Sequence, residues 1–188
     1  DVRAADQVSA LFECIDAAHG RLDGLVCAAG ILRGAFLSPE ELPLEDFQAV
    51  QEVNVTGVFL CVKYGAHLLE KAGGRAVMVV ISSGAGVVGP SSSLAYAASK
   101  GGVNGLALTL EAQLARRGIR VNTLYPGSII TPMKMRVEVE NAQRKGIPVE
   151  QALADAERSY GTPDGVARLI AFVLSDEASY LRGALTTR

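Results

Sequence analysis

Apolar residues recur along the chain with two different spacings. Over residues 5–19 the hydrophobic positions fall three or four residues apart, which predicts an amphipathic helix that ends at Gly20. The runs at 22–30, 75–82 and 119–127 are instead short, mainly apolar and bounded by glycine or polar residues. Such runs are typical of strands that are buried on both faces of a parallel sheet.

Longer segments with helical periodicity lie between these predicted strands. We expect helices over about 44–72, 94–117 and 162–176, a polar and mostly helical stretch over 128–160, and a last short strand within 179–188. Strands and helices therefore alternate, which predicts a single α/β domain over 1–188, with a parallel sheet between helices on both of its faces. No linker or internal repeat interrupts this order.

Composition narrows the class of protein. With 188 residues, 49% of them hydrophobic, the chain can bury the core of one domain. Its net charge of −2, with both signs mixed along the chain, argues against a nucleic-acid partner. The sequence has no apolar run long enough to span a membrane and does not begin like a signal peptide. We therefore expect neither a nucleic-acid nor a membrane partner.

Cysteine and histidine usage adds two expectations. Cys14, Cys27 and Cys61 are too far apart for a CxxC motif. An odd number of cysteines in apolar surroundings favours a reduced, cytoplasmic protein in which all three are small buried hydrophobic residues. His19 and His67 cannot form a metal site alone, so we expect no metal.

The segments after the predicted strands share one character. Ala28–Gly30, Ser82–Gly84 and Pro126–Gly127 are all small or polar. Ligands of open α/β sheets bind beyond the carboxyl ends of the strands. We therefore expect a ligand crevice at this edge of the sheet.

Tyr96 and Lys100 lie four residues apart in a predicted helix and so share one helical face. An ammonium group one turn away favours the phenolate and lowers its pKa from about 10. Such a pair can move a proton to or from an alcohol oxygen. Taken alone, Y-x-x-x-K is more often two exposed residues. Here, however, Ser83 ends the second predicted strand, and Asn54 lies inside the long helix before it.

These residues, with C-A-A-G at 27–30 and Y-P-G-S-I-I-T at 125–131, resemble the classical short-chain dehydrogenase/reductase family over nearly the whole chain. The resemblance implies a Rossmann-like, doubly wound parallel sheet in three α/β/α layers. It also implies an NAD(P)-dependent oxidoreductase that interconverts a secondary alcohol and a ketone.

The resemblance assigns four catalytic roles. Tyr96 would be the general acid/base, and Ser83 would orient the substrate oxygen. Lys100 would lower the pKa of Tyr96 and bind the nicotinamide ribose, while Asn54 would hold a water molecule of a proton relay. Binding alone does not require this complete set, which argues against the alternative of a catalytically inactive nucleotide-binding or regulatory relative.

The resemblance also implies contacts with NAD or NADP, between which the sequence does not decide. The cofactor-binding residues would be Asp1 and Val2 at the adenine, Ala28, Ala29 and Gly30 at the adenosine ribose, Tyr96 and Lys100 at the nicotinamide ribose, and Pro126, Gly127, Ile129 and Thr131 at the carboxamide.

The chain departs from the family pattern in two ways. Cys27 stands where the family usually has asparagine, which puts the stability of that turn in doubt. The family's first two strand–helix units, with the Gly-rich turn that binds pyrophosphate, would precede Asp1, and its D-G-G segment would follow Arg188. We expect the chain to be part of a longer enzyme, truncated at its N-terminal side. The alternative is a short, non-catalytic form.

Two further expectations concern the whole protein. The segment 128–160 should be a mobile lid over a small alcohol or ketone substrate. The helices at 44–72 and 94–117 resemble the pair that forms oligomers in the family, which implies a homotetramer or dimer by analogy.

Overall fold

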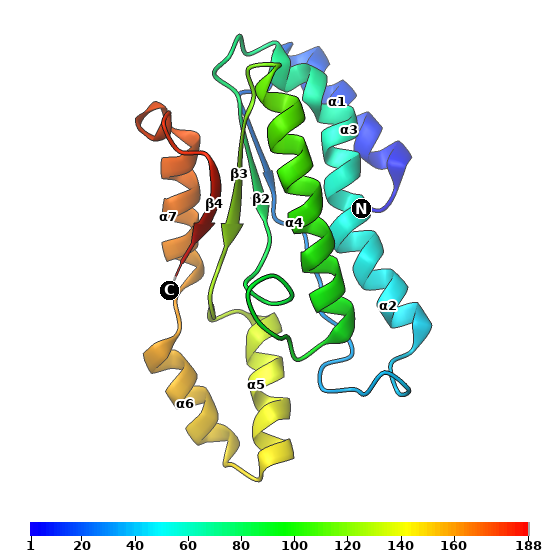
Figure 1. Ribbon diagram of the computed structural model, residues 1–188, viewed down its shortest axis with the longest axis vertical. Coiled ribbons are helices and arrows are strands. Elements are labelled where there is room, and N and C mark those ends of the chain that lie inside the picture. The colour runs from blue at the N-terminus through cyan, green and yellow to red at the C-terminus, as the bar shows by residue number, and fades with distance from the viewer. Residues whose placement is uncertain (188) are drawn as a thin grey trace.

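The computed structural model describes residues 1–187 and contains a parallel sheet of four strands in the order β1-β2-β3-β4 (Figure 1). These are β1 (Gly24–Cys27), β2 (Val77–Ile81), β3 (Arg120–Tyr125) and β4 (Gly183–Thr186). In the centre of the sheet, Val79 pairs with Val26 on one side and Asn122 on the other. All four strands therefore end at the same edge of the sheet.

Helices fill the connections between the strands. They are α1 (Ala5–His19), α2 (Leu44–Gln51), the π-helical turn η1 (Glu52–Thr56), α3 (Gly57–Glu70), α4 (Leu94–Ala115), α5 (Pro132–Lys145), α6 (Val149–Ser159), α7 (Pro163–Leu174) and the 3₁₀ turn η2 (Asp176–Ala178). Caps mark several starts, because the Ser93, Thr131 and Thr162 side chains accept backbone N–H bonds at the first turns of α4, α5 and α7.

Alternate residues of the central strand face the two helical layers. Met78 and Val80 belong to the core that α3 and α4 cover, whereas Val77 and Val79 belong to the core on the α7 side. Figure 1 shows the sheet between these layers, with α1 alongside α3 and with α5 and α6 extending past the end of the sheet. The predicted parallel α/β arrangement is therefore confirmed.

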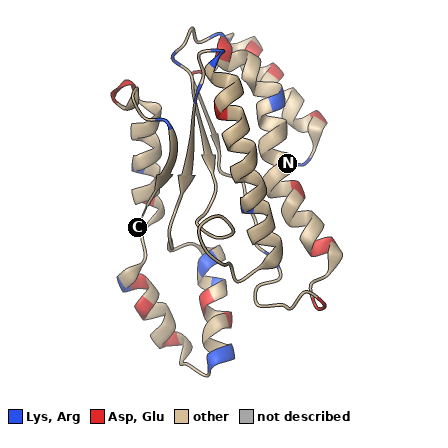
Figure 2. Cartoon of the chain, in the orientation of Figure 1, with Lys and Arg blue, Asp and Glu red and all other residues tan. Residues whose placement is uncertain are grey.

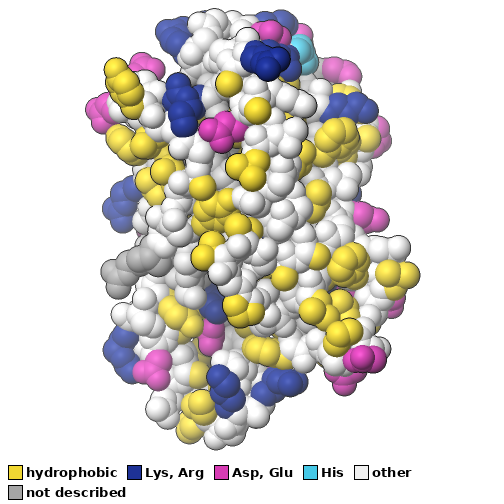
Figure 3. Space-filling model, in the orientation of Figure 1, with side chains coloured by type: hydrophobic (Ala, Val, Ile, Leu, Met, Phe, Trp, Pro, Cys, Tyr) yellow, Lys and Arg dark blue, Asp and Glu magenta, His cyan; other side chains and the backbone are white. Residues whose placement is uncertain are grey.

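Charged residues are rare in the sheet and common on the helices beyond its end. Apart from Arg120, the strands carry no charged residue, while charged side chains are numerous on α5 and α6 (Figure 2). The space-filling view shows hydrophobic side chains across the middle of the face formed by α4 and β4 (Figure 3). Within residues 1–187, no helix is long and apolar enough to cross a membrane.

The structure differs from the sequence-based expectation in two details. The helix predicted over 44–72 is interrupted by the π-helical turn Glu52–Thr56, which contains Asn54. The prediction for the cysteines is right for buried Cys27 but wrong for Cys14, which is exposed, because Cys14 lies on the outer face of the surface helix α1. Cys61 is half-buried and accepts a hydrogen bond from the Cys27 thiol, which lowers the Cys61 pKa to about 7.

Candidate active site

A cavity of about 950 Å³ lies beyond the carboxyl ends of β1, β2 and β3. Its lining includes most of the residues predicted to bind cofactor or perform catalysis: Ala28, Gly30, Ser83, Tyr96, Lys100, Pro126, Gly127, Ile129 and Thr131. The parallel register explains this convergence, since the residues that follow parallel strands meet at one edge of the sheet. Segments far apart in the sequence thus contribute to a single cavity.

Tyr96 lies in the first turn of α4, directly after the Ser93 cap, whose Oγ accepts the Tyr96 N–H at 3.1 Å. Burial raises the pKa of the Tyr96 phenol, and a hydrogen bond from the Ser83 hydroxyl opposes this rise. Ser83 is itself held by the N–H of Ala85, which its Oγ accepts at 3.2 Å. The pair therefore presents two hydroxyls to the same part of the cavity.

Lys100 follows Tyr96 by one helical turn and is only 5% exposed. Its Nζ donates to the Ile81 carbonyl at 2.8 Å and lies 5.4 Å from the centroid of the Tyr96 ring. Burial lowers the pKa of the ammonium to about 8. The expected lowering of the Tyr96 pKa by Lys100 is not seen in this structure. Burial raises that pKa, and the group that opposes the rise is Ser83.

Asn54 is buried at the π-helical turn and lies outside the cavity lining. Its amide nitrogen donates to the Ile31 carbonyl at 3.0 Å and to Ser99 Oγ at 2.9 Å, while its oxygen accepts the Ile31 N–H at 2.8 Å. Ser99 in turn donates to the Tyr96 carbonyl at 2.8 Å. Asn54 therefore ties the loop after β1 to the helix that carries Tyr96 and Lys100.

Gly30 lies close to both Asn54 and Lys100. A Cβ added to Gly30 would lie 3.5 Å from Asn54 Oδ1 and 3.9 Å from Lys100 Nζ. The missing side chain thus leaves a small space that faces both polar groups. The predicted role of Asn54 in holding a water molecule remains a prediction.

Gly86 is a structural requirement of the site that the sequence did not single out. It adopts φ 76°, and an added Cβ would lie 2.3 Å from the Ala97 carbonyl oxygen. Any other residue would therefore strain the backbone and displace the loop after β2 from α4. This close approach holds the Ser83 loop against the helix that carries Tyr96.

Three predicted cofactor residues lie outside the lining of the cavity. The Asp1 carboxylate binds the Arg3 guanidinium at 2.6 Å, and Val2 packs against Gly57, where an added Cβ would lie 2.8 Å from Val2 Cγ2. Ala29 is between two lining residues but is not itself part of the lining. Their contacts with a cofactor remain predictions.

The cavity is also lined by residues that were not predicted from the sequence. The segment 128–160 was expected to cover the substrate, but α7 and the loops after β1 and β2 also contribute. The added residues include Leu32, Phe36, Pro90, Pro163, Val166 and Ile170. On α5 the Lys134 ammonium binds the Glu138 carboxylate at 2.7 Å, and the Tyr160 hydroxyl donates to the same carboxylate at 2.9 Å. In the sequence, Pro163 indicates only the start of a helix after the Thr162 cap. Nothing near it in the sequence indicates contact with a ligand.

Known proteins resemble this chain over almost its full length. The family described as Enoyl-(Acyl carrier protein) reductase matches residues 1–187. A 3-oxoacyl-[acyl-carrier-protein] reductase of Synechocystis is 38% identical over 97% of this chain and 70% of its own length. A (3R)-3-hydroxyacyl-CoA dehydrogenase of Mus musculus is 36% identical over 98% and 68%, respectively. The crystal structure of an NAD⁺-bound xylitol dehydrogenase matches with a TM-score of 0.85 and 29% identity over 99% of this chain and 75% of its own.

The chain belongs to the classical short-chain dehydrogenase/reductase family, as its motifs indicated. Its relatives are named as reductases and dehydrogenases, so the prediction of an oxidoreductase for hydroxyl or keto groups is confirmed at that level. The chain spans about 70% of the length of the Synechocystis relative.

Proposed function

We propose that this chain carries the catalytic site of an NAD- or NADP-dependent oxidoreductase that interconverts a secondary alcohol and a ketone, with Tyr96 as the general acid/base. The observation that carries the proposal is the half-buried Tyr96 phenol, which accepts a hydrogen bond from Ser83 and lies one helical turn from buried Lys100 in a cavity at the strand ends. The named activities of the relatives support the same reaction class.

Each side chain has a defined task in the reduction of a ketone. When the ketone binds, the single O–H of Ser83 turns from the Tyr96 phenol to the substrate carbonyl oxygen and holds that oxygen beside the phenol. Tyr96 transfers its proton to that oxygen as negative charge develops there. The Lys100 ammonium stabilises the phenolate that remains, and the reverse steps serve alcohol oxidation.

The residues at the cavity fit the nicotinamide end of such a cofactor. The Lys100 ammonium has three donors, of which the Ile81 carbonyl takes one, so two remain for the hydroxyls of a ribose. Pro126, Gly127, Ile129 and Thr131 form the wall of the cavity after β3 and are available to a carboxamide. The cofactor, when bound, would supply or accept the hydride.

Cofactor oxidation by the full-length protein tests this proposal. With NADH or NADPH and a panel of ketones, we expect loss of reduced cofactor, and Tyr96→Phe should lower kcat/KM by at least about a hundredfold. Cofactor affinity should change little in this variant. Retention of most of the activity would overturn the role of Tyr96. A cofactor-induced rise in melting temperature without any turnover would instead support the inactive nucleotide-binding relative.

The assembly and location of the protein also belong to the proposal. The outer face of α4 exposes Leu108, and the outer face of α3 exposes Phe59, which supports a homodimer or homotetramer through these helices. Light scattering after size exclusion would contradict this assembly if it showed a monomer.

The free thiols of Cys14, Cys27 and Cys61 support a location in the reducing cytoplasm, which cell fractionation can test.

A further inference from the structure

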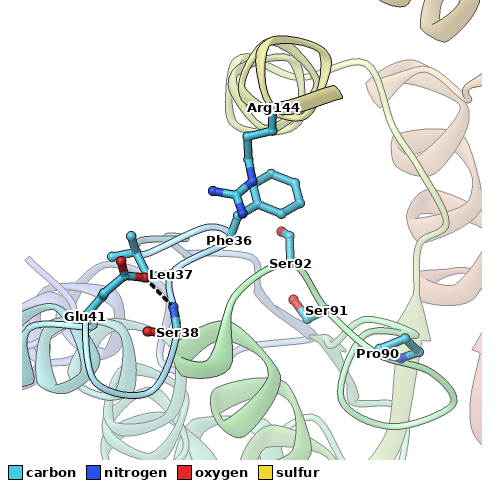
Figure 4. A pocket seen from close by; sticks show the side chains of 8 residues that line it. All are labelled: Phe36, Leu37, Ser38, Glu41, Pro90, Ser91, Ser92 and Arg144. Atoms are coloured by element: carbon cyan, nitrogen blue, oxygen red, sulfur yellow. Dashed lines mark hydrogen bonds between the residues drawn. The ribbon is translucent and has the colours of Figure 1, made fainter. Parts of the chain in front are cut away.

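A second hollow, of about 630 Å³, adjoins the active-site cavity. The two share Phe36, Pro90, Ser91 and Ser92, so these residues lie on the boundary between them. Figure 4 shows Arg144, from α5, reaching over this boundary toward the ring of Phe36. A ligand that extends from Tyr96 beyond Phe36 would therefore meet Arg144.

Arg144 has no carboxylate partner at ion-pair distance within residues 1–187. Its guanidinium lies 5.4 Å from the centroid of the Phe36 ring, a cation–π contact that leaves its N–H donors available. Glu41 is the acidic residue of the hollow, and its carboxylate accepts the Ser38 N–H at 2.9 Å (Figure 4). This hydrogen bond lowers the Glu41 pKa, and the charge of Arg144 lowers it by a smaller amount, but the two side chains are not at ion-pair distance.

Phe36 is held in an uncommon conformation. Its φ of 60° is in the left-handed region, the only such value for a non-glycine residue between positions 1 and 187. A hydrogen bond from its N–H to the Ser92 carbonyl at 2.6 Å and the bridge between Ala35 and Ser93 fix this conformation. Strain in a bulky residue is typical of ligand-contacting positions, and here it places the ring under the guanidinium.

We infer that this hollow is an outer substrate subsite in which Arg144, with the Ser91 and Ser92 hydroxyls, binds a carboxylate or phosphate at the far end of the alcohol or ketone substrate. This inference rests on the proposed function. A planar guanidinium suits both anions, because it can donate two parallel hydrogen bonds to either of them. Between the reacting carbon and the anion, Phe36 and Pro90 would contact an apolar stretch of the substrate.

Matched pairs of ketones test the subsite in the full-length protein. The carboxylate arm uses 4-oxopentanoate, 5-oxohexanoate, 6-oxoheptanoate and 7-oxooctanoate, each against its methyl ester. The phosphate arm uses 5-hydroxypentan-2-one phosphate against 5-hydroxypentan-2-one. For at least one chain length, we expect kcat/KM for the anion to exceed that for its neutral partner by about tenfold.

Arg144→Met should abolish this preference, and Arg144→Lys should retain part of it. Arg136→Ala is the matched control, because Arg136 is an exposed arginine on the same helix outside both hollows, and it should leave the preference unchanged. If Arg144 only supported the fold, the anion and its neutral partner would lose activity equally. An equal anion-to-neutral ratio in the wild type and Arg144→Met would therefore overturn the subsite.

The two proposals can fail separately. If neutral and anionic ketones are both inert, the proposed function fails, and calorimetric titration of the protein with 6-oxoheptanoate and its methyl ester then decides on the subsite. Tighter binding of the acid than of the ester, lost in Arg144→Met, would support the anion site without turnover. Equal affinities in both proteins would exclude it.

Discussion

Burial acts in opposite directions on the two residues that define the site. It raises the pKa of the Tyr96 phenol and lowers that of the Lys100 ammonium to about 8, so it favours the neutral form of each. Proton transfer from Tyr96, however, leaves a phenolate. Ser83 is therefore important, because its hydrogen bond opposes the effect of burial on Tyr96.

This balance predicts a pH effect for Ser83→Ala. Loss of the hydroxyl removes the interaction that lowers the Tyr96 pKa, so the pKa should rise further. Alcohol oxidation needs the phenolate, and the rising limb of its kcat/KM profile should therefore move to higher pH, with a rate loss of about tenfold to a hundredfold near neutrality. Steady-state rates across pH measure this. Ser83→Thr retains the hydroxyl and should restore the position of the limb; an unmoved limb in Ser83→Ala would count against this role.

Lys100 also makes the stability of the fold depend on pH. The Lys100 pKa is about 8 in the folded protein, against an ordinary lysine pKa of 10.5. Between these values the unfolded chain binds more protons, so the contribution of Lys100 to stability rises with pH and is lost as pH falls through about 8. Between pH 7 and pH 10 the wild type should therefore gain about 2 kcal/mol in the free energy of unfolding that Lys100→Met does not gain.

Urea titrations at the two pH values measure this change. The comparison between pH values separates the proton effect from the lost hydrogen bond to the Ile81 carbonyl, which Lys100→Met removes at every pH. Lys63→Met, at an exposed lysine of α3, is the control. A difference between Lys100→Met and wild type that stays constant with pH would contradict the assignment of the low Lys100 pKa.

At the scale of elements, periodicity predicts nearly every helix and strand that the structure contains. The helix from residue 5 to Gly20 and the helix at 94–117 agree closely with α1 and α4. The π-helical turn at Asn54 was not predictable, because it depends on hydrogen bonds to Ile31 and Ser99, which come from distant parts of the chain. Local spacing reports local structure, whereas this turn is set by tertiary contacts.

Helix packing gives an element-scale prediction at Gly65 of α3. A Cβ there would lie 2.6 Å from an atom of the Phe12 ring in α1, so Gly65→Ala should force the two helices apart and reduce the free energy of unfolding by about 1–2 kcal/mol. Gly165→Ala, in α7, places its Cβ in ordinary contact, 3.5 Å from Thr162 Oγ1, and should stabilise slightly. Thermal and urea unfolding of both variants test the contrast; a loss of stability in both, or in neither, would refute it.

For the molecule as a whole, the sequence indicated which residues meet at the strand ends but not how the outer wall is made. Ser83, Tyr96 and Lys100 share one cavity because a parallel sheet brings their elements to one edge. The contact of Arg144 with Phe36 joins residues more than a hundred positions apart, and no motif or period signals it. Side-chain pairs of this kind require the three-dimensional arrangement of α5, which periodicity leaves open.

The α5–α6 hairpin is the part of the molecule that we expect to move. Helices α5 and α6 pack mainly against each other. Figure 1 shows the pair extending beyond the sheet. Its base is pinned where the Gly161 N–H donates to the Ser128 carbonyl at 2.9 Å and the Ile130 N–H donates to the Gly161 carbonyl at 2.9 Å. This arrangement supports the proposal that 128–160 is a lid that turns about a fixed base and closes over the substrate.

Hydrogen exchange tests the lid in the full-length protein. Amides of α5 and α6 should exchange faster than those of α3 and α4, which pack against the sheet. Addition of oxidised cofactor with a turned-over alcohol should slow exchange in the hairpin by about tenfold or more, because closure buries its inner face. The amides of α1, remote from the cavity, provide the internal control, and limited proteolysis should show the same protection. Equal exchange and equal protease sensitivity with and without ligands would mean that the hairpin is a rigid wall of the site.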